Sequence, residues 1–150
     1  MSHKAKVTYE KLAQGLPSFE AVNDLLDIEN LDEEKMSIKA ICAKAKEKIE
    51  EHTHLLETIL QPDNSFTSLT EASAFTDEGK KEVLETLRKL MQLDRKLMAA
   101  SINATYEEQL LHTIMQTYDG LKGKLLDIIK QLEECWNHKE EQQIQERYFG

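Results

Sequence analysis

The sequence predicts an all-α protein, an elongated antiparallel bundle of three to four main helices with coiled-coil character. The chain has only five glycines and two prolines among 150 residues, and 31% of its residues are charged. Few turn-forming residues and many charged side chains favour long helices over sheets. The apolar fraction of 40% suffices for one core. We therefore expect a single helical domain over residues 1–150, in which segment 1–17 can fray and residues 137–150 form a polar extension.

The first expected break in the chain is Gly15-Leu16-Pro17-Ser18. The mildly basic residues before it, through Gln14, predict a helix that can fray. Ser18 is placed to cap a second, short helix that we expect to end near Glu29-Asn30. That helix has one apolar face, made of Phe19, Val22, Leu25 and Leu26.

A long helix is expected to begin at about Glu33 and to end before Pro62. Asp32 can cap it, and Leu31 lies at staple spacing from Met36. Lys48 and His52 interrupt any strict heptad pattern. The apolar positions that define its face are Ile38, Ile41, Ala45, Ile49, Leu55, Leu56, Ile59 and Leu60.

The segment from Pro62 to Thr76 is rich in Ser, Thr, Asp and Asn, which predicts a loop with one helical turn around Leu69 to Ala74. Thr76 is placed to cap the next long helix, whose wide apolar stripe we expect to lie in a core. Asp94 interrupts the stripe, and either a Lys or Arg partner or a position at the stripe's edge would explain it. The stripe consists of Val83, Leu84, Leu87, Leu90, Met91, Leu97, Met98 and Ile102.

The last helix is expected from Thr105 to Trp136, after a turn at 101–105 where Thr105 and Glu108 match a capping box. Gly120 and Gly123 within it indicate either close approach of a neighbouring helix or a ligand helix, or a kink. Its apolar residues alternate spacings of three and four without a miss, which is typical of a coiled-coil seam. The seam consists of Leu111, Ile114, Tyr118, Leu121, Leu125, Ile128, Leu132 and Cys135.

The net charge of -9 disfavours nucleic-acid binding and a membrane-surface role, because both depend on Lys and Arg. The acidic stretch from Glu20 to Glu34 is either a solvated face or a contact for a basic partner. Cys42 and Cys135 are interpreted as buried free thiols in a reducing compartment. No run of 18 apolar residues and no apolar signal segment is present, so we expect a cytoplasmic protein.

No motif in the sequence indicates catalysis, a cofactor or a metal. Glu51 and His54 form a Glu-x-x-His unit, but a di-iron bundle needs a second such unit. Cys135 and His138 are three residues apart and supply half a metal site at most. Nucleophile-elbow and phosphate-loop patterns are missing. The aromatic pair Tyr148-Phe149 can either pack back on the bundle or form a docking peptide.

The stretch from Val83 to Met98, which reads VLETLRKLMQLDRKLM, resembles the long helix of bacterial flagellar export chaperones. The resemblance covers roughly a tenth of the chain. It implies a bundle of three or four helices with a late amphipathic helix that grips an export substrate's C-terminal helix or docks to the export machinery. In this chain that helix would be the one from Thr105 to Trp136.

We expect a non-enzymatic chaperone or adaptor that holds a helix of a protein partner in an apolar groove, and that can form a homodimer. The alternatives are an obligate structural subunit of a larger coiled-coil assembly and a metal-dependent helical-bundle enzyme. The acidic segment before Asp32 is expected to tune the encounter rate. The predicted partner-binding residues are the seam positions Leu111, Ile114, Tyr118, Leu121, Leu125, Ile128 and Leu132.

Overall fold

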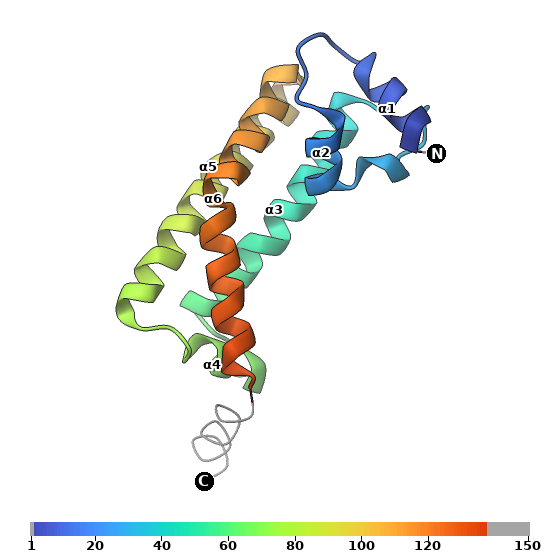
Figure 1. The fold of residues 1–150 in the computed structure, drawn as a ribbon. Coiled ribbons are helices and arrows are strands. Elements are labelled where there is room, and N and C mark those ends of the chain that lie inside the picture. Colours follow the sequence, from blue (N-terminus) through green and yellow to red (C-terminus); the bar gives the residue numbers. More distant parts are fainter. Residues whose placement is uncertain (1, 138–150) are drawn as a thin grey trace. The chain divides into compact units, whose positions relative to one another are not determined.

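The computed structural model describes residues 2–137 and confirms that this part of the chain is all-α (Figure 1). Within that range the backbone forms six α-helices and one 3-10 helix, with no strand. In chain order the elements are α1 (Ser2–Glu10), α2 (Phe19–Leu26), η1 (Ile28–Asn30), α3 (Ile38–Leu60), α4 (Phe66–Ala72), α5 (Asp77–Asn103) and α6 (Glu108–Cys135).

The chain divides into two compact units. The first unit comprises Met1–Glu51 and Leu90–Gly120, and the second comprises His52–Lys89 and Leu121–Gly150. The three long helices α3, α5 and α6 each contribute one part to each unit. Each unit is described by itself below.

In the first unit, α1, α2 and η1 pack together. The Ser18 side chain accepts a hydrogen bond from the Ala21 amide at 3.2 Å, which confirms its predicted role as the cap of α2. The Tyr9 hydroxyl donates to the Pro17 carbonyl at 2.7 Å, and the Tyr9 ring meets Phe19 edge-on at 5.8 Å between centroids. Buried aromatic contacts therefore hold α1 against the start of α2.

Two predicted helix boundaries in the first unit are wrong. The helix α2 ends at Leu26 because Asp27 adopts a left-handed conformation, with φ of 54°, which a short polar side chain tolerates. The helix α3 begins at Ile38 and not at Glu33. Ser37 caps it, since its hydroxyl accepts from the Ala40 amide at 3.0 Å.

In the second unit, α3 ends at Leu60, before Pro62, as predicted. The predicted helical turn is instead the helix α4, which starts earlier because the Ser65 hydroxyl accepts from the Ser68 amide at 3.1 Å. Near the end of α6, the Trp136 indole donates to the Glu71 carboxylate at 3.0 Å, and its ring lies 6.1 Å from that of Phe66. These contacts join α4 to the residue that directly follows α6.

The predicted break between the last two long helices is present. Helix α5 ends at Asn103, and Ala104 follows with a φ of 53°. Helix α6 then begins at Glu108. Thr105 therefore lies three residues before the first helical residue, too early for the N-cap of the predicted capping box.

Neither Gly120 nor Gly123 lies in close contact with another helix of the described chain. A Cβ atom built on either residue has no other atom of the chain within 4 Å, so both positions face open space. The helix also runs without interruption from Glu108 to Cys135. Both glycines lie on the exposed side of α6.

Replacing Gly120 or Gly123 with alanine is expected to raise the free energy of unfolding by about 0.4–1 kcal/mol, because alanine restricts the unfolded chain and fits the open site. Urea denaturation of the two variants measures this. Gly15→Ala is the matched control, since Gly15 has a φ of +75° and alanine there should destabilise. Destabilisation by Gly120→Ala would show that the backbone at this position carries a constraint.

Candidate protein-binding surface

The seam of α6, predicted as the partner-binding surface, is buried within the chain. Its first three positions belong to the first unit and its other positions to the second. A partner could reach these side chains only after the chain's own helices had separated. The buried seam residues are Leu111, Ile114, Tyr118, Leu121, Leu125, Ile128, Leu132 and Cys135.

The apolar stripe of α5 lies only partly in the core, which corrects the expectation for this helix. Val83, Leu90 and Leu97 are buried, whereas Leu84 is 47% exposed. The other exposed members of the stripe are Met98 and Ile102. The stripe is wider than the face that the neighbouring helices cover.

Three apolar residues of α5 in the first unit that are exposed or half-buried form what we call the outer face of α5, defined as Met91, Met98 and Ile102. Their spacing of seven and four residues places them on one side of the helix. Met91 is half-buried, Met98 is 40% exposed and Ile102 is 81% exposed. Arg95, which is exposed, occupies the remaining position of this side. Sequence periodicity found these residues but assigned them to the core.

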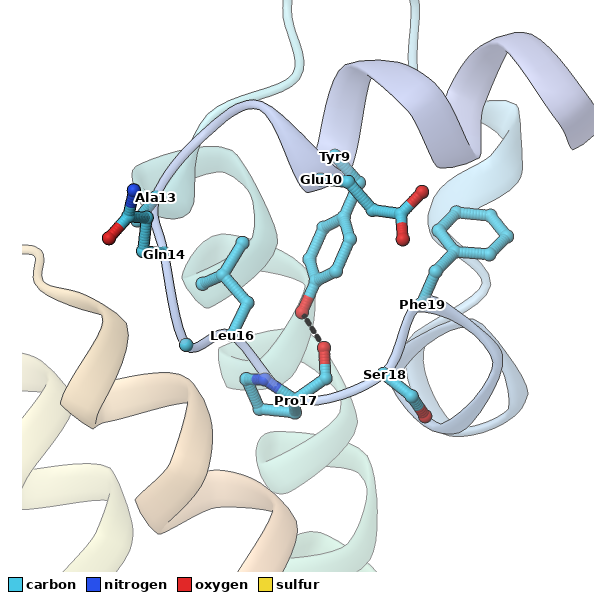
Figure 2. Close-up of a pocket in the computed structure, with 9 residues that line it drawn as sticks. Tyr9, Glu10, Ala13, Gln14, Leu16, Pro17, Ser18 and Phe19 are labelled. Carbon is cyan, nitrogen blue, oxygen red and sulfur yellow. Dashed lines mark hydrogen bonds between the residues drawn. The ribbon is translucent and has the colours of Figure 1, made fainter.

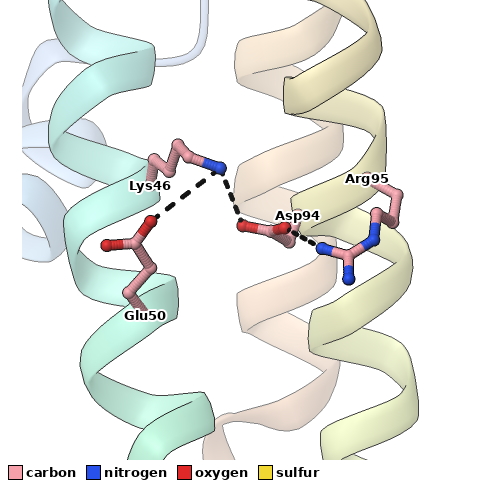
Figure 3. A network of polar contacts seen from close by, with 4 residues as sticks. All are labelled: Lys46, Glu50, Asp94 and Arg95. Atoms are coloured by element: carbon pink, nitrogen blue, oxygen red, sulfur yellow. Dashed lines mark hydrogen bonds and ion pairs between the residues drawn. The ribbon is translucent and has the colours of Figure 1, made fainter.

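Asp94, the acidic residue within the stripe, has two basic partners (Figure 3). Its side chain is 8% exposed, and its carboxylate lies 3.3 Å from the Lys46 ammonium and 2.6 Å from the Arg95 guanidinium. Lys46 also lies 3.8 Å from Glu50. The prediction of a Lys or Arg partner is confirmed, and the cluster links α3 to α5 within the first unit.

A pocket of about 330 Å³ lies in the first unit between the end of α1 and the start of α2 (Figure 2). Tyr9, Gln14, Leu16 and Phe19 contribute to its lining. The Tyr9 hydroxyl is engaged by the Pro17 carbonyl, so it is not available as a free acid. The His112 imidazole of α6 contacts the Gly15 carbonyl of the same loop.

The acidic segment of the first unit is exposed. Asp24, Asp27, Glu29 and Glu33 lie at the surface, and Asp32 pairs with Lys35 at 3.9 Å. Among residues 2–137, no ion pair involves the first four of these carboxylates. The two interpretations made from the sequence, a solvated face and a contact for a basic partner, both stay open.

The Glu51–His54 half-site gains no further metal ligand among the described residues. Glu51 is exposed and lies 4.0 Å from Lys48, and His54 is exposed. In the part of the chain that the structure describes, no group of three or more His, Cys, Asp or Glu side chains could hold a metal ion. His138 lies outside the described residues, as do Tyr148 and Phe149.

Cys42 and Cys135 are both buried and neither belongs to a disulfide, as predicted. Burial raises the pKa of the Cys42 thiol to about 11. That thiol is therefore protonated at neutral pH, when it is a poor nucleophile and metal ligand.

Buried tyrosines make the stability of the fold vary with pH in the alkaline range. Burial raises the pKa of Tyr9 to about 12. Burial also raises the pKa of Tyr118, and the Glu51 carboxylate adds to that shift. A tyrosine ionises near pH 10 in an unfolded chain, roughly its reference value, so the unfolded state releases these protons first.

The free energy of unfolding is therefore expected to fall as pH rises above about 10, and to keep falling until the folded tyrosines ionise, which for Tyr9 is at about pH 12. Denaturation across this pH range measures the slope. Tyr118→Phe should reduce the slope, because it removes one raised pKa. An identical slope in this variant would contradict the contribution assigned to Tyr118, since Tyr9 and the lysines would then explain the whole effect.

Comparisons of the chain with protein-family models, with curated proteins and with solved structures gave no match. None of the helices between residues 2 and 137 combines the length and apolar character needed to cross a membrane.

Proposed function

We propose that the protein is a non-enzymatic protein-binding protein, a chaperone or adaptor, that holds a helix of a partner on the outer face of α5. The observation that supports this proposal is the exposure of Met98 and Ile102, which have the helical spacing of core residues. The proposal includes an antiparallel bundle of coiled-coil character for the helix segments within each unit. It also keeps the predicted cytoplasmic location.

The energetics favour this face over the seam of α6. Exposing one buried leucine or isoleucine to water costs about 1.5–3 kcal/mol. A partner that replaced α6 contacts would first have to expose several such residues. Ile102 is already 81% exposed, so a partner can bury this residue without opening the fold. Flexible methionine side chains such as Met98 also adapt to different partner surfaces.

The partner suited to this face is an amphipathic helix with apolar residues at spacings of three and four. Arg95 lies on the same side and already contacts Asp94. Its guanidinium has five N–H donors and is exposed, so it can also donate hydrogen bonds to a carboxylate of the partner. The preferred ligand is therefore an apolar helix with a carboxylate opposite Arg95.

The experiment compares the wild-type protein with a Met98→Glu/Ile102→Glu variant as baits in the native cell extract. We expect that the variant fails to capture a protein that the wild type captures. Once this partner is purified, it should bind the variant at least about 100-fold more weakly than the wild type. Leu84→Glu makes the same kind of change at an exposed α5 residue of the second unit and should retain binding. Equal affinity of wild type and the double variant for the captured partner would overturn the proposed face.

The exposed apolar residues also suit the alternative function, an obligate subunit of a larger coiled-coil assembly. The two functions differ in the behaviour of the isolated chain. A chaperone or adaptor should melt in one cooperative transition without its partner, whereas an orphan subunit should melt cooperatively only in its assembly. Calorimetry of the purified chain decides between them.

A further inference from the structure

A second exposed stripe runs along α6 in the second unit. It consists of Lys122, Leu126, Ile129 and Glu133, which we call the Leu126 face. The spacings of four, three and four residues place all of them on one side of the helix. Leu126 is 56% exposed and Ile129 is 36% exposed, while the seam residues Leu125 and Ile128 beside them are buried.

The charges on the Leu126 face are arranged so that the face complements itself in one orientation. Along the helix the order is a cation, two apolar residues and an anion. When two such helices lie antiparallel, Lys122 of each copy lies opposite Glu133 of the other, and Leu126 lies opposite Ile129. When they lie parallel in register, Lys122 faces Lys122 and Glu133 faces Glu133. Like charges facing each other oppose association, so the pattern selects the antiparallel pair.

Neither charged end of the Leu126 face has an ion-pair partner within residues 2–137. Both Lys122 and Glu133 are exposed. Each can therefore form an intermolecular pair without breaking an intramolecular one. The apolar centre supplies the contact, and the charges set its direction.

We propose that the Leu126 face binds a second copy of this chain in an antiparallel, two-fold symmetric dimer. The two-fold axis passes midway between Asp127 and Ile128 of each helix. It makes the two Lys122–Glu133 contacts identical, as an isologous interface requires. The contact is one helix face wide, so we expect reversible association in roughly the micromolar range. This inference is independent of the proposed partner on α5.

Sedimentation equilibrium of the full chain over a range of concentrations tests the apolar contact. The wild type should show a monomer–dimer equilibrium, and Leu126→Glu should weaken it on the order of a hundredfold or more, since both copies are changed. Circular dichroism should show an unchanged helical content, because Leu126 is exposed. Ile102→Glu, a matched change in the first unit, should leave the equilibrium unaltered. A wild type that stays monomeric, or a dimer lost in Ile102→Glu and kept in Leu126→Glu, would overturn the proposal.

Charge exchange tests the orientation. Lys122→Glu alone, or Glu133→Lys alone, should weaken association by about tenfold or more, because like charges then meet at both ends. The double variant Lys122→Glu/Glu133→Lys should associate like the wild type, and an equal mixture of the two single variants should form mixed dimers. If the single variants associate as tightly as the wild type, the antiparallel pairing is wrong.

Discussion

Replacing Leu121 with alanine is expected to lower the free energy of unfolding by about 2–5 kcal/mol, because the substitution removes buried methyl groups and leaves a cavity. Leu121 is 2% exposed and lies on the seam of α6 in the second unit. The surrounding core relaxes only partly around such a cavity, so the cost exceeds that of transfer alone. Urea denaturation followed by circular dichroism measures the difference.

Leu84→Ala is the matched control for this substitution. It removes the same atoms from a side chain in the same unit that is 47% exposed. The expected loss is below about 1 kcal/mol, since much of that side chain is in water in the folded state. A small loss for Leu121→Ala, similar to that of the control, would mean that the seam lines an open groove as the sequence first suggested.

The second large effect is expected from Lys46→Met. This substitution leaves the Asp94 carboxylate buried with Arg95 as its remaining basic partner. Removing one partner of a buried polar or charged group typically costs about 1–3 kcal/mol. We therefore expect the free energy of unfolding to fall by an amount in this range. Lys46 is itself partly exposed, which keeps the effect below that of a fully buried pair.

The double variant Lys46→Met/Asp94→Leu should recover most of that loss, because an apolar pair of similar size removes the unpaired charge. Glu50→Gln is the control, since Glu50 lies 3.8 Å from Lys46 and is largely exposed, and its effect should stay within about 0.5 kcal/mol. Denaturation of these variants together with Asp94→Leu forms a thermodynamic cycle. Equal stability of Lys46→Met and the wild type would show that Arg95 alone satisfies Asp94.

The sequence predicted the long helices well because their apolar spacing is a local property. The seam of α6, the end of α3 before Pro62 and the cap at Ser18 all follow from residues within a few positions of one another. The start of α3 was less predictable, since both Asp32 and Ser37 are suitable caps. Tertiary context decides between them, and Met36 is buried in the non-helical stretch that precedes Ser37.

The candidate surface was harder to predict, because periodicity finds apolar stripes but does not say which part of a stripe a neighbour covers. On α5 the stripe was assigned to a core, whereas Met98 and Ile102 are exposed. On α6 the seam residues that were predicted to bind a partner are buried. The spacing of both stripes was predicted correctly, and their burial required the positions of the other helices.

The most direct test of the central claim is hydrogen exchange of the full chain with and without a purified partner, resolved by peptide mass spectrometry. If the outer face of α5 binds the partner, amides in the last turns of α5 around Met98 and Ile102 should exchange more slowly in the complex. Amides along α6 from Leu111 to Leu132 should keep their rates, since the seam stays packed. Faster exchange along α6 on partner binding, with unchanged rates around Ile102, would show that the helices open and that the partner occupies the seam.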